Sequence, residues 1–179
     1  MYKKRFFYTL FTELSHDTLN NSLARTAIVR IFFLLLCLGT FAFADTKKFM
    51  IDLKTGDFET FDKVILSGMP GTIDYFRGQG DTVEVAVVIH GDAYKFFVKN
   101  LENTQYGVDK SLVERQESIQ KRLEEIEKKY QVHLEICMSG MHKKGILTED
   151  IYPFVTPIKS AMVGLVKWQN EGYGYIPVH

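Results

Sequence analysis

One of the two cysteines, Cys137, occupies the position in this sequence where chemistry is easiest to expect. It follows residues 132–136, in which apolar and polar side chains alternate with the period of a β-strand. The chain after it is short, basic and contains glycine, so we expect a turn into a helix there. A thiol beside helix N-terminal amides feels their partial positive charge, which favours the nucleophilic thiolate. The position therefore predicts a reactive thiol.

A second interpretation of this thiol stays open on the residues alone. Free cysteine is among the most buried residue types, so Cys137 could simply be packed in a core. The basic residues that follow, His142, Lys143 and Lys144, could stabilise a thiolate. Lysine side chains usually point to solvent, however, and the basic run alone does not decide between the two interpretations.

No other motif of comparable strength is present in the sequence. There is no glycine-rich loop of the kind that cradles phosphate, and Ser139 lacks the G-x-S-x-G frame of a nucleophile elbow. The histidines show no spacing typical of metal ligands: His90, His133, His142 and His179. We therefore expect neither a metal nor a cofactor.

Strands and helices are expected to alternate along the chain. Residues 83–89 are β-branched and almost continuously apolar, which is typical of a strand covered on both faces of a parallel sheet. Other strands are expected at residues 48–54, 132–137, 159–163 and 173–178. Helices are expected at residues 58–76 with a break or kink near Pro70, at 111–130 and at 164–171. This alternation predicts an α/β fold.

The predicted fold is a doubly wound, mostly parallel five-stranded sheet with helices on both faces and the flavodoxin-like order 2-1-3-4-5. Ligands in such sheets bind beyond the carboxyl ends of the strands. With the first and third strands as neighbours, we expect a crevice next to Cys137. The residues expected at its rim are Gly56, Asp57, His90, Gly91, Ser139 and His142.

Two of these rim residues also have ordinary explanations. Asp57 is a good N-cap for the helix that follows it. His90 could be a turn residue that is hydrogen-bonded to the backbone, because a lone histidine is weak support for catalysis.

The first 44 residues resemble a secretory signal with an unusually long n-region. Arg25 and Arg30 provide a basic flank, residues 31–38 an apolar run, and residues 42–44 a small-x-small cleavage site. We expect cleavage after Ala44, which leaves residues 45–179 as one periplasmic or secreted domain that is free of the membrane. The apolar run is short for a membrane span, but an uncleaved anchor is the alternative.

Removing residues 1–44 changes the charge and the cysteine count. It takes away five of the 22 basic and two of the 22 acidic residues, which leaves 17 and 20. A mildly negative domain argues against binding nucleic acid, which requires a clustered basic face. Cys137 becomes the only cysteine, so no internal disulfide can form. An odd cysteine in an exported protein suggests a reactive thiol or an intermolecular bridge.

Three segments resemble the DsrE/DsrF-like (TusD-related) superfamily: residues 87–93, 135–141 and 171–177. The similarity covers about residues 46–178. It implies a five-stranded parallel sheet with helices on both faces, assembly as a homo-oligomer (trimer or hexamer), and a single cysteine that passes persulfide sulfur between proteins. Cys137 stands at the family's cysteine position. The well-understood sulfur-relay members are cytoplasmic, whereas this chain carries an export signal.

The resemblance and the lone thiol together predict a periplasmic sulfur-handling or thiol-redox protein, a persulfide carrier that acts through Cys137. Its partner would be a sulfur donor or acceptor protein, or a small sulfane-sulfur compound. The alternative is a non-enzymatic oligomeric binding module in which Cys137 is structural. Whether the protein is an enzyme stays open.

Overall fold

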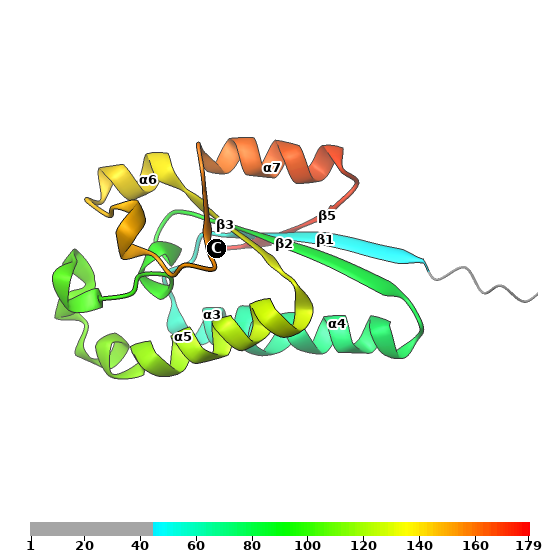
Figure 1. Ribbon diagram of the computed structural model, residues 1–179, viewed down its shortest axis with the longest axis horizontal. Helices are drawn as coiled ribbons and strands as arrows, with labels where there is room; N and C mark the ends of the chain where they lie inside the picture. The colour runs from blue at the N-terminus through cyan, green and yellow to red at the C-terminus, as the bar shows by residue number, and fades with distance from the viewer. Residues whose placement is uncertain (1–44) are drawn as a thin grey trace, which may run out of the picture. The chain divides into compact units, whose positions relative to one another are not determined.

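A parallel five-stranded sheet organises residues 45–179, the part of the chain that this computed structural model describes (Figure 1). All four pairs of neighbouring strands are parallel. The strands are β1 (Thr46–Leu53), β2 (Thr82–Ile89), β3 (His133–Cys137), β4 (Thr156–Ile158) and β5 (Gly174–Val178). The predicted α/β class with a five-stranded parallel sheet is confirmed.

Helices cover both faces of this sheet. The helices are α3 (Phe58–Phe61), a π-helical segment (Asp62–Gly68), α4 (Met69–Gly78), α5 (Lys110–Tyr130), α6 (Met138–Lys143) and α7 (Ala161–Asn170). Short 3₁₀ turns lie at Ala93–Phe96, Leu101–Asn103, Gln105–Val108 and Thr148–Asp150. Helices α3, α4 and α5 lie on one face and α7 lies on the other, as the doubly wound arrangement requires (Figure 1).

The strand order is β4-β3-β2-β1-β5, so the predicted order 2-1-3-4-5 is wrong. Strand β2 lies between β1 and β3, which are therefore not neighbours. The crossovers through α4 and α5 cover the same face, and right-handed crossovers on one face advance in one direction across the sheet. Helix α7 crosses the opposite face and returns the chain to β5, beside β1.

The core has one hydrophobic cluster on each face of the sheet. The larger cluster includes Leu123 of α5 and Val87 of β2, and the smaller one joins Val88 of β2 to Trp168 of α7. Val87 and Val88 are both fully buried although they point to opposite faces. The prediction that residues 83–89 form a strand covered on both faces is therefore confirmed.

The predicted break near Pro70 is absent, because the chain stays helical from Phe58 to Gly78. The π-helical segment Asp62–Gly68 ends just before α4, and Pro70 lies in the first turn of α4. The wider turns of a π-helix leave some backbone carbonyls without the usual i+4 donor, so a proline, which has no N–H, is tolerated there.

The predicted strand at residues 159–163 is also wrong. The fourth strand is Thr156–Ile158, and residues 161–170 form α7. Ser160 caps this helix, because its hydroxyl accepts a hydrogen bond from the Val163 amide at 3.4 Å. Pro157 is tolerated in β4 because β4 is an edge strand.

None of the helices within residues 45–179 is long and apolar enough to cross a membrane. The predicted signal segment, residues 1–44, lies outside the described residues.

A buried tyrosine holds the end of β3 in place. Tyr94, in the 3₁₀ turn after β2, donates its hydroxyl hydrogen to the carbonyl oxygen of Cys137 at 3.0 Å. Burial raises the pKa of Tyr94, so its hydroxyl stays a donor. Gly140 packs against this hydroxyl so closely that a Cβ there would lie 1.9 Å from the Tyr94 oxygen. The contact fixes where β3 ends and α6 begins.

We expect Gly140→Ala to lower the free energy of unfolding by about 1–3 kcal/mol, because the added methyl group must displace the Tyr94 hydroxyl from the Cys137 carbonyl. Urea denaturation measures this change. Gly71→Ala is the matched control, because it is another helical glycine, with no atom within 4 Å of its added Cβ. That control should keep or slightly raise stability. Equal stability of the two variants would contradict the prediction.

Candidate functional site

The parallel register of β2 and β3 brings His90 next to Cys137. Ile89 pairs with Ile136, and His90 and Cys137 are the residues that follow this pair. Neighbouring strands lie about 4.8 Å apart, and side chains alternate between faces along a strand. The two residues therefore leave the carboxyl edge of the sheet from neighbouring strands, and Cys137 also packs in the larger hydrophobic cluster.

A cavity of about 280 Å³ opens at this edge. It contains four of the seven residues that the sequence singled out, namely Cys137, His90, Gly91 and Ser139. The described residues that complete its lining are Tyr94, Gly140, Lys143 and Lys144. Cys137 itself is only 7% exposed, so the thiol is reached through this cavity.

The other three predicted rim residues are not among the described residues that line the cavity. A Cβ on Gly56 would lie 2.8 Å from the Cβ of Asp92, so Gly56 serves close packing. Asp57 caps α3 by accepting the Thr60 amide at 2.7 Å, and this hydrogen bond lowers the pKa of Asp57. His142 is exposed on α6. The expected crevice between the first and third strands does not form because β2 lies between them.

Behind His90 lies a buried carboxylate whose partners the sequence did not reveal. Asp52 of β1 is 5% exposed, and its Oδ1 is 2.6 Å from Nε2 of His90. Its Oδ2 accepts the hydroxyl hydrogen of Tyr175 of β5 at 2.6 Å. This hydrogen bond raises the pKa of Tyr175, so the phenol stays a donor. An aspartate within the apolar run 49–53 was the available signal, because a buried strand tolerates a carboxylate only when it has partners.

A second buried carboxylate, Glu135 of β3, has a structural role. It accepts a hydrogen bond from the Trp168 indole at 2.9 Å and pairs with Nζ of Lys167 at 2.9 Å. Both partners belong to α7, so this carboxylate attaches α7 to the sheet. Glu135 is not among the described residues that line the cavity.

Two lysines place positive charge at the mouth of the cavity. Lys144 pairs with Asp92 at 3.0 Å, and this hydrogen bond raises the pKa of Lys144. Lys143 is exposed and has no ion-pair partner among the described residues. Within residues 45–179, no group of three or more His, Cys, Asp or Glu side chains is placed to hold a metal ion.

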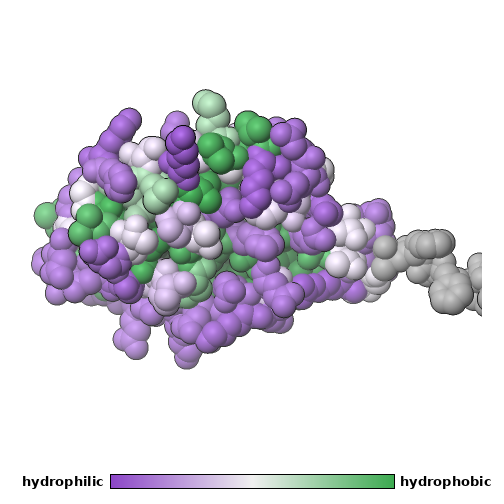
Figure 2. Space-filling view, turned by 45° about the horizontal axis from the view of Figure 1, so that its top comes forward, coloured by the Kyte–Doolittle hydropathy of each residue, from purple (hydrophilic) through white to green (hydrophobic). Residues whose placement is uncertain are grey.

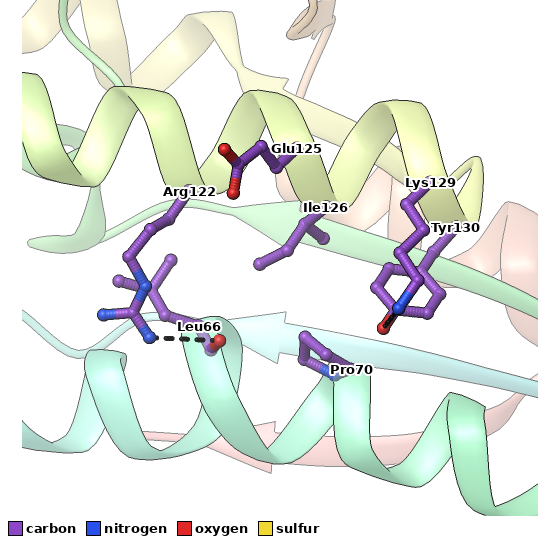
Figure 3. A pocket seen from close by; sticks show the side chains of 7 residues that line it. All are labelled: Leu66, Pro70, Arg122, Glu125, Ile126, Lys129 and Tyr130. Atoms are coloured by element: carbon purple, nitrogen blue, oxygen red, sulfur yellow. Dashed lines mark hydrogen bonds between the residues drawn. The ribbon is translucent and has the colours of Figure 1, made fainter.

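A different hollow, of about 220 Å³, lies between α5 and the helical segment that leads into α4 (Figure 3). The Arg122 side chain spans it and donates to the carbonyl oxygen of Leu66 at 3.2 Å. Among the described residues that line it there is no thiol and no imidazole, and the only hydroxyl is that of Tyr130. We therefore assign the candidate site to the cavity at Cys137.

Comparison with known proteins agrees with this fold. An uncharacterised protein of Aquifex aeolicus (strain VF5) is 25% identical over 158 residues, which are 88% of this chain and 68% of that protein. The solved structure of a protein of unknown function from Methanobacterium thermoautotrophicum matches with a TM-score of 0.51 at 17% identity. The match covers 74% of this chain and 98% of that one, and at this identity it supports the fold alone.

The model of the DsrE/DsrF-like family matches residues 47–178, which include all five strands except the first residue of β1. The matched segment also contains Cys137 and His90. With a match that spans nearly the whole described domain, this chain belongs to the DsrE/DsrF-like family.

Proposed function

We propose that this protein carries sulfur as a persulfide on Cys137, or exchanges thiols there. Membership of the DsrE/DsrF-like family implies a role of the sulfur-relay kind. The observation that supports the finer proposal is the cavity at the carboxyl edge of the sheet. Its lining includes Cys137, the only cysteine of residues 45–179, together with an imidazole and two lysines.

The proposed reaction is an exchange at sulfur. The Cys137 thiolate attacks the outer sulfur of a sulfane donor, and a new S–S bond forms while the donor's own bond to that sulfur breaks. The leaving group departs with the electron pair of the broken bond. An acceptor thiolate then attacks the outer sulfur of the persulfide, and Cys137 leaves as a thiolate. Sulfur moves from donor to acceptor without an added oxidant.

The charge at the cavity mouth fits this class of donor. Thiosulfate and polysulfides are anions, and Lys143 and Lys144 line the cavity that leads to Cys137. Positive charge at a cavity raises the local concentration of anionic reactants. A persulfidated protein would donate its outer sulfur by the same exchange reaction and would contact a larger surface around the cavity.

Polysulfide or thiosulfate treatment of the purified protein should add the mass of one sulfur atom to the peptide that contains Cys137. Peptide mapping separates this product from any adduct on Cys37. A thiol reductant should remove the added sulfur, and Cys137→Ser should show none. The proposal fails if Cys137 takes up no sulfur under conditions in which a model peptide thiol does.

A non-enzymatic binding module is the second candidate, and the low exposure of Cys137 favours it. A packed cysteine would react with a thiol dye only on unfolding, whereas a cysteine that works through the cavity would react in the native protein. If Cys137→Ser keeps its fold, its oligomeric state and its function in the cell, the binding module is the correct function.

We also propose that the protein assembles as a homo-oligomer, a trimer or hexamer as the family resemblance implies. The outer side of α7 supports this, because Met162, Val163 and Val166 are exposed there, with Met162 74% exposed. Apolar side chains interrupt the polar surface on the side of the domain that carries α7 (Figure 2). A contiguous apolar patch of this kind is typical of an interaction surface. Pro157 and Pro177 remove N–H donors from both edge strands, which disfavours assembly by sheet extension.

Val166→Glu should lower the molar mass measured by light scattering after gel filtration, because a carboxylate cannot be buried in an apolar interface without a partner. Val108→Glu is the control, since Val108 is a still more exposed valine, at 85% against 53% for Val166, in a 3₁₀ turn far along the chain from α7. The control should keep the mass of the wild type. An unchanged mass for Val166→Glu would remove α7 as the assembly surface.

Export to the periplasm is a further part of the proposal, supported by the basic flank, apolar run and small-x-small site of residues 1–44. The mature protein should be found in the periplasmic fraction with Asp45 as its first residue, which intact-mass measurement and N-terminal sequencing determine. Full-length protein that stays in the membrane fraction would show an uncleaved anchor instead.

A further inference from the structure

We propose that His90 is the proton acceptor for the Cys137 thiol, and that Asp52 and Tyr175 are positioning residues that hold His90 in the accepting tautomer. This inference rests on the proposed function of Cys137. Its basis is the hydrogen-bonded group formed by Tyr175, Asp52 and His90, which ends at the cavity that contains Cys137.

The backbone of His90 is held firmly against the end of β1. Its amide donates to the carbonyl oxygen of Leu53 at 3.0 Å, and the Asp92 amide donates to that of Lys54 at 3.0 Å. Gly91, between them, has a φ of 65°, and a Cβ there would lie 2.9 Å from the Lys54 carbonyl oxygen. A side chain is therefore excluded at position 91, and this tight turn sets the direction in which the imidazole leaves β2.

The two partners of Asp52 determine which nitrogen of His90 carries the proton. An ionised carboxylate only accepts hydrogen bonds, so Nε2 of His90 donates to Oδ1 and the Tyr175 hydroxyl donates to Oδ2. Neutral His90 then has its single ring proton on Nε2 and a lone pair on Nδ1. Among the described residues, the hydrogen bonds of the His90 ring involve Nε2 alone. Nδ1 is therefore the nitrogen available for the thiol proton.

The contrast with Glu135 argues against a purely structural role for Asp52. Glu135 pairs with the ammonium group of Lys167, and it is not among the described residues that line the cavity. Asp52 instead pairs with His90, an imidazole that can accept a proton and whose side chain is 23% exposed. A buried carboxylate beside such a ring stabilises the imidazolium that forms when the ring accepts a proton.

The proposed step is a proton transfer from sulfur to nitrogen. The S–H bond of Cys137 breaks, an N–H bond forms at Nδ1 of His90, and the electron pair stays on sulfur. The product is a thiolate beside an imidazolium whose Nε2–H is paired with Asp52. When the thiolate attacks a sulfane donor, the imidazolium proton can pass to the leaving group.

Several other charged or titratable groups lie close to His90. Lys54 and Asp92 flank the turn, and Asp92 is paired with Lys144. The described titratable groups around the imidazole and its cavity are Asp52, Lys54, Asp92, Tyr94, Cys137, Lys143, Lys144 and Tyr175.

The test is the rate at which iodoacetamide alkylates Cys137 between pH 5 and 10, followed by peptide mass. At pH about 6.5 we expect His90→Gln to react at least about tenfold more slowly than the wild type, and the two rates should converge above pH about 9, where an isolated thiol ionises by itself. His142→Gln is the matched control, an exposed histidine of α6, and it should keep the wild-type profile.

The positioning residues make separate predictions. Asp52→Asn should slow alkylation near neutral pH in the same way, because the amide can donate to Nε2 and move the ring proton to Nδ1. Tyr175→Phe removes one of two donors to Asp52, so we expect a smaller loss of about two- to fivefold. Tyr175 is 46% exposed, so this variant keeps the test decisive if Asp52→Asn does not fold.

Two outcomes overturn the inference. One is a wild-type pH profile for His90→Gln, and the other is a loss by the same factor at every pH, which indicates a structural role. Uptake of sulfur from polysulfide at pH about 9, where Cys137 needs no base, tests the proposed function separately. If both the wild type and His90→Gln take up sulfur at this pH, the carrier role is upheld whatever the pH profile of alkylation. If neither takes up sulfur, the carrier role is refuted, but the inference about His90 is not.

Discussion

The packing of β2 on every side is the constraint on which the candidate site depends. Strands β1 and β3 flank it, and hydrophobic clusters cover both of its faces. Because side chains alternate with a period of two, a slip of one residue would move each of its two buried rows into the cluster on the opposite face. Burial of Val87 and Val88 thus fixes the register of β2 against both neighbours. That register places His90 beside Asp52 and at the cavity that Cys137 also lines.

The two buried carboxylates show how the same costly group serves two purposes. Removing a carboxylate from water is unfavourable unless hydrogen bonds and charge compensate it, and each of these carboxylates has two partners. Glu135 is compensated by a lysine and an indole from α7, so its interactions hold a helix on the sheet. Asp52 is compensated by a histidine and a phenol, so its interactions reach a cavity. The chemical type of the partners therefore distinguishes the carboxylate that supports the structure from the one that belongs to the candidate site.

Strands β2, β3 and β4 are added on one side of β1, and β5 is added on the other side. The strand order therefore reverses between β1 and β5, where the Tyr175 hydroxyl donates to Asp52. Open α/β sheets bind ligands beyond the carboxyl ends of strands, at the point where the order reverses. The candidate site therefore extends from this point to Cys137, across the end of β2. The flavodoxin-like order predicted a crevice between the first and third strands, and this displaced expectation explains why Gly56 and Asp57 were expected at its rim.

Local patterns in the sequence were sufficient to predict most elements, because hydrophobic periodicity and capping act over a few residues. The strand before His90, the helix at residues 111–130 and the thiol at a strand end all follow from such patterns. Tertiary structure alone decided the strand order and the contacts of Asp52. Its partners His90 and Tyr175 are 38 and 123 positions away along the chain. Their meeting depends on which face of the sheet each crossover covers, and no short stretch of sequence encodes that choice, because it is made by the packing of whole helices.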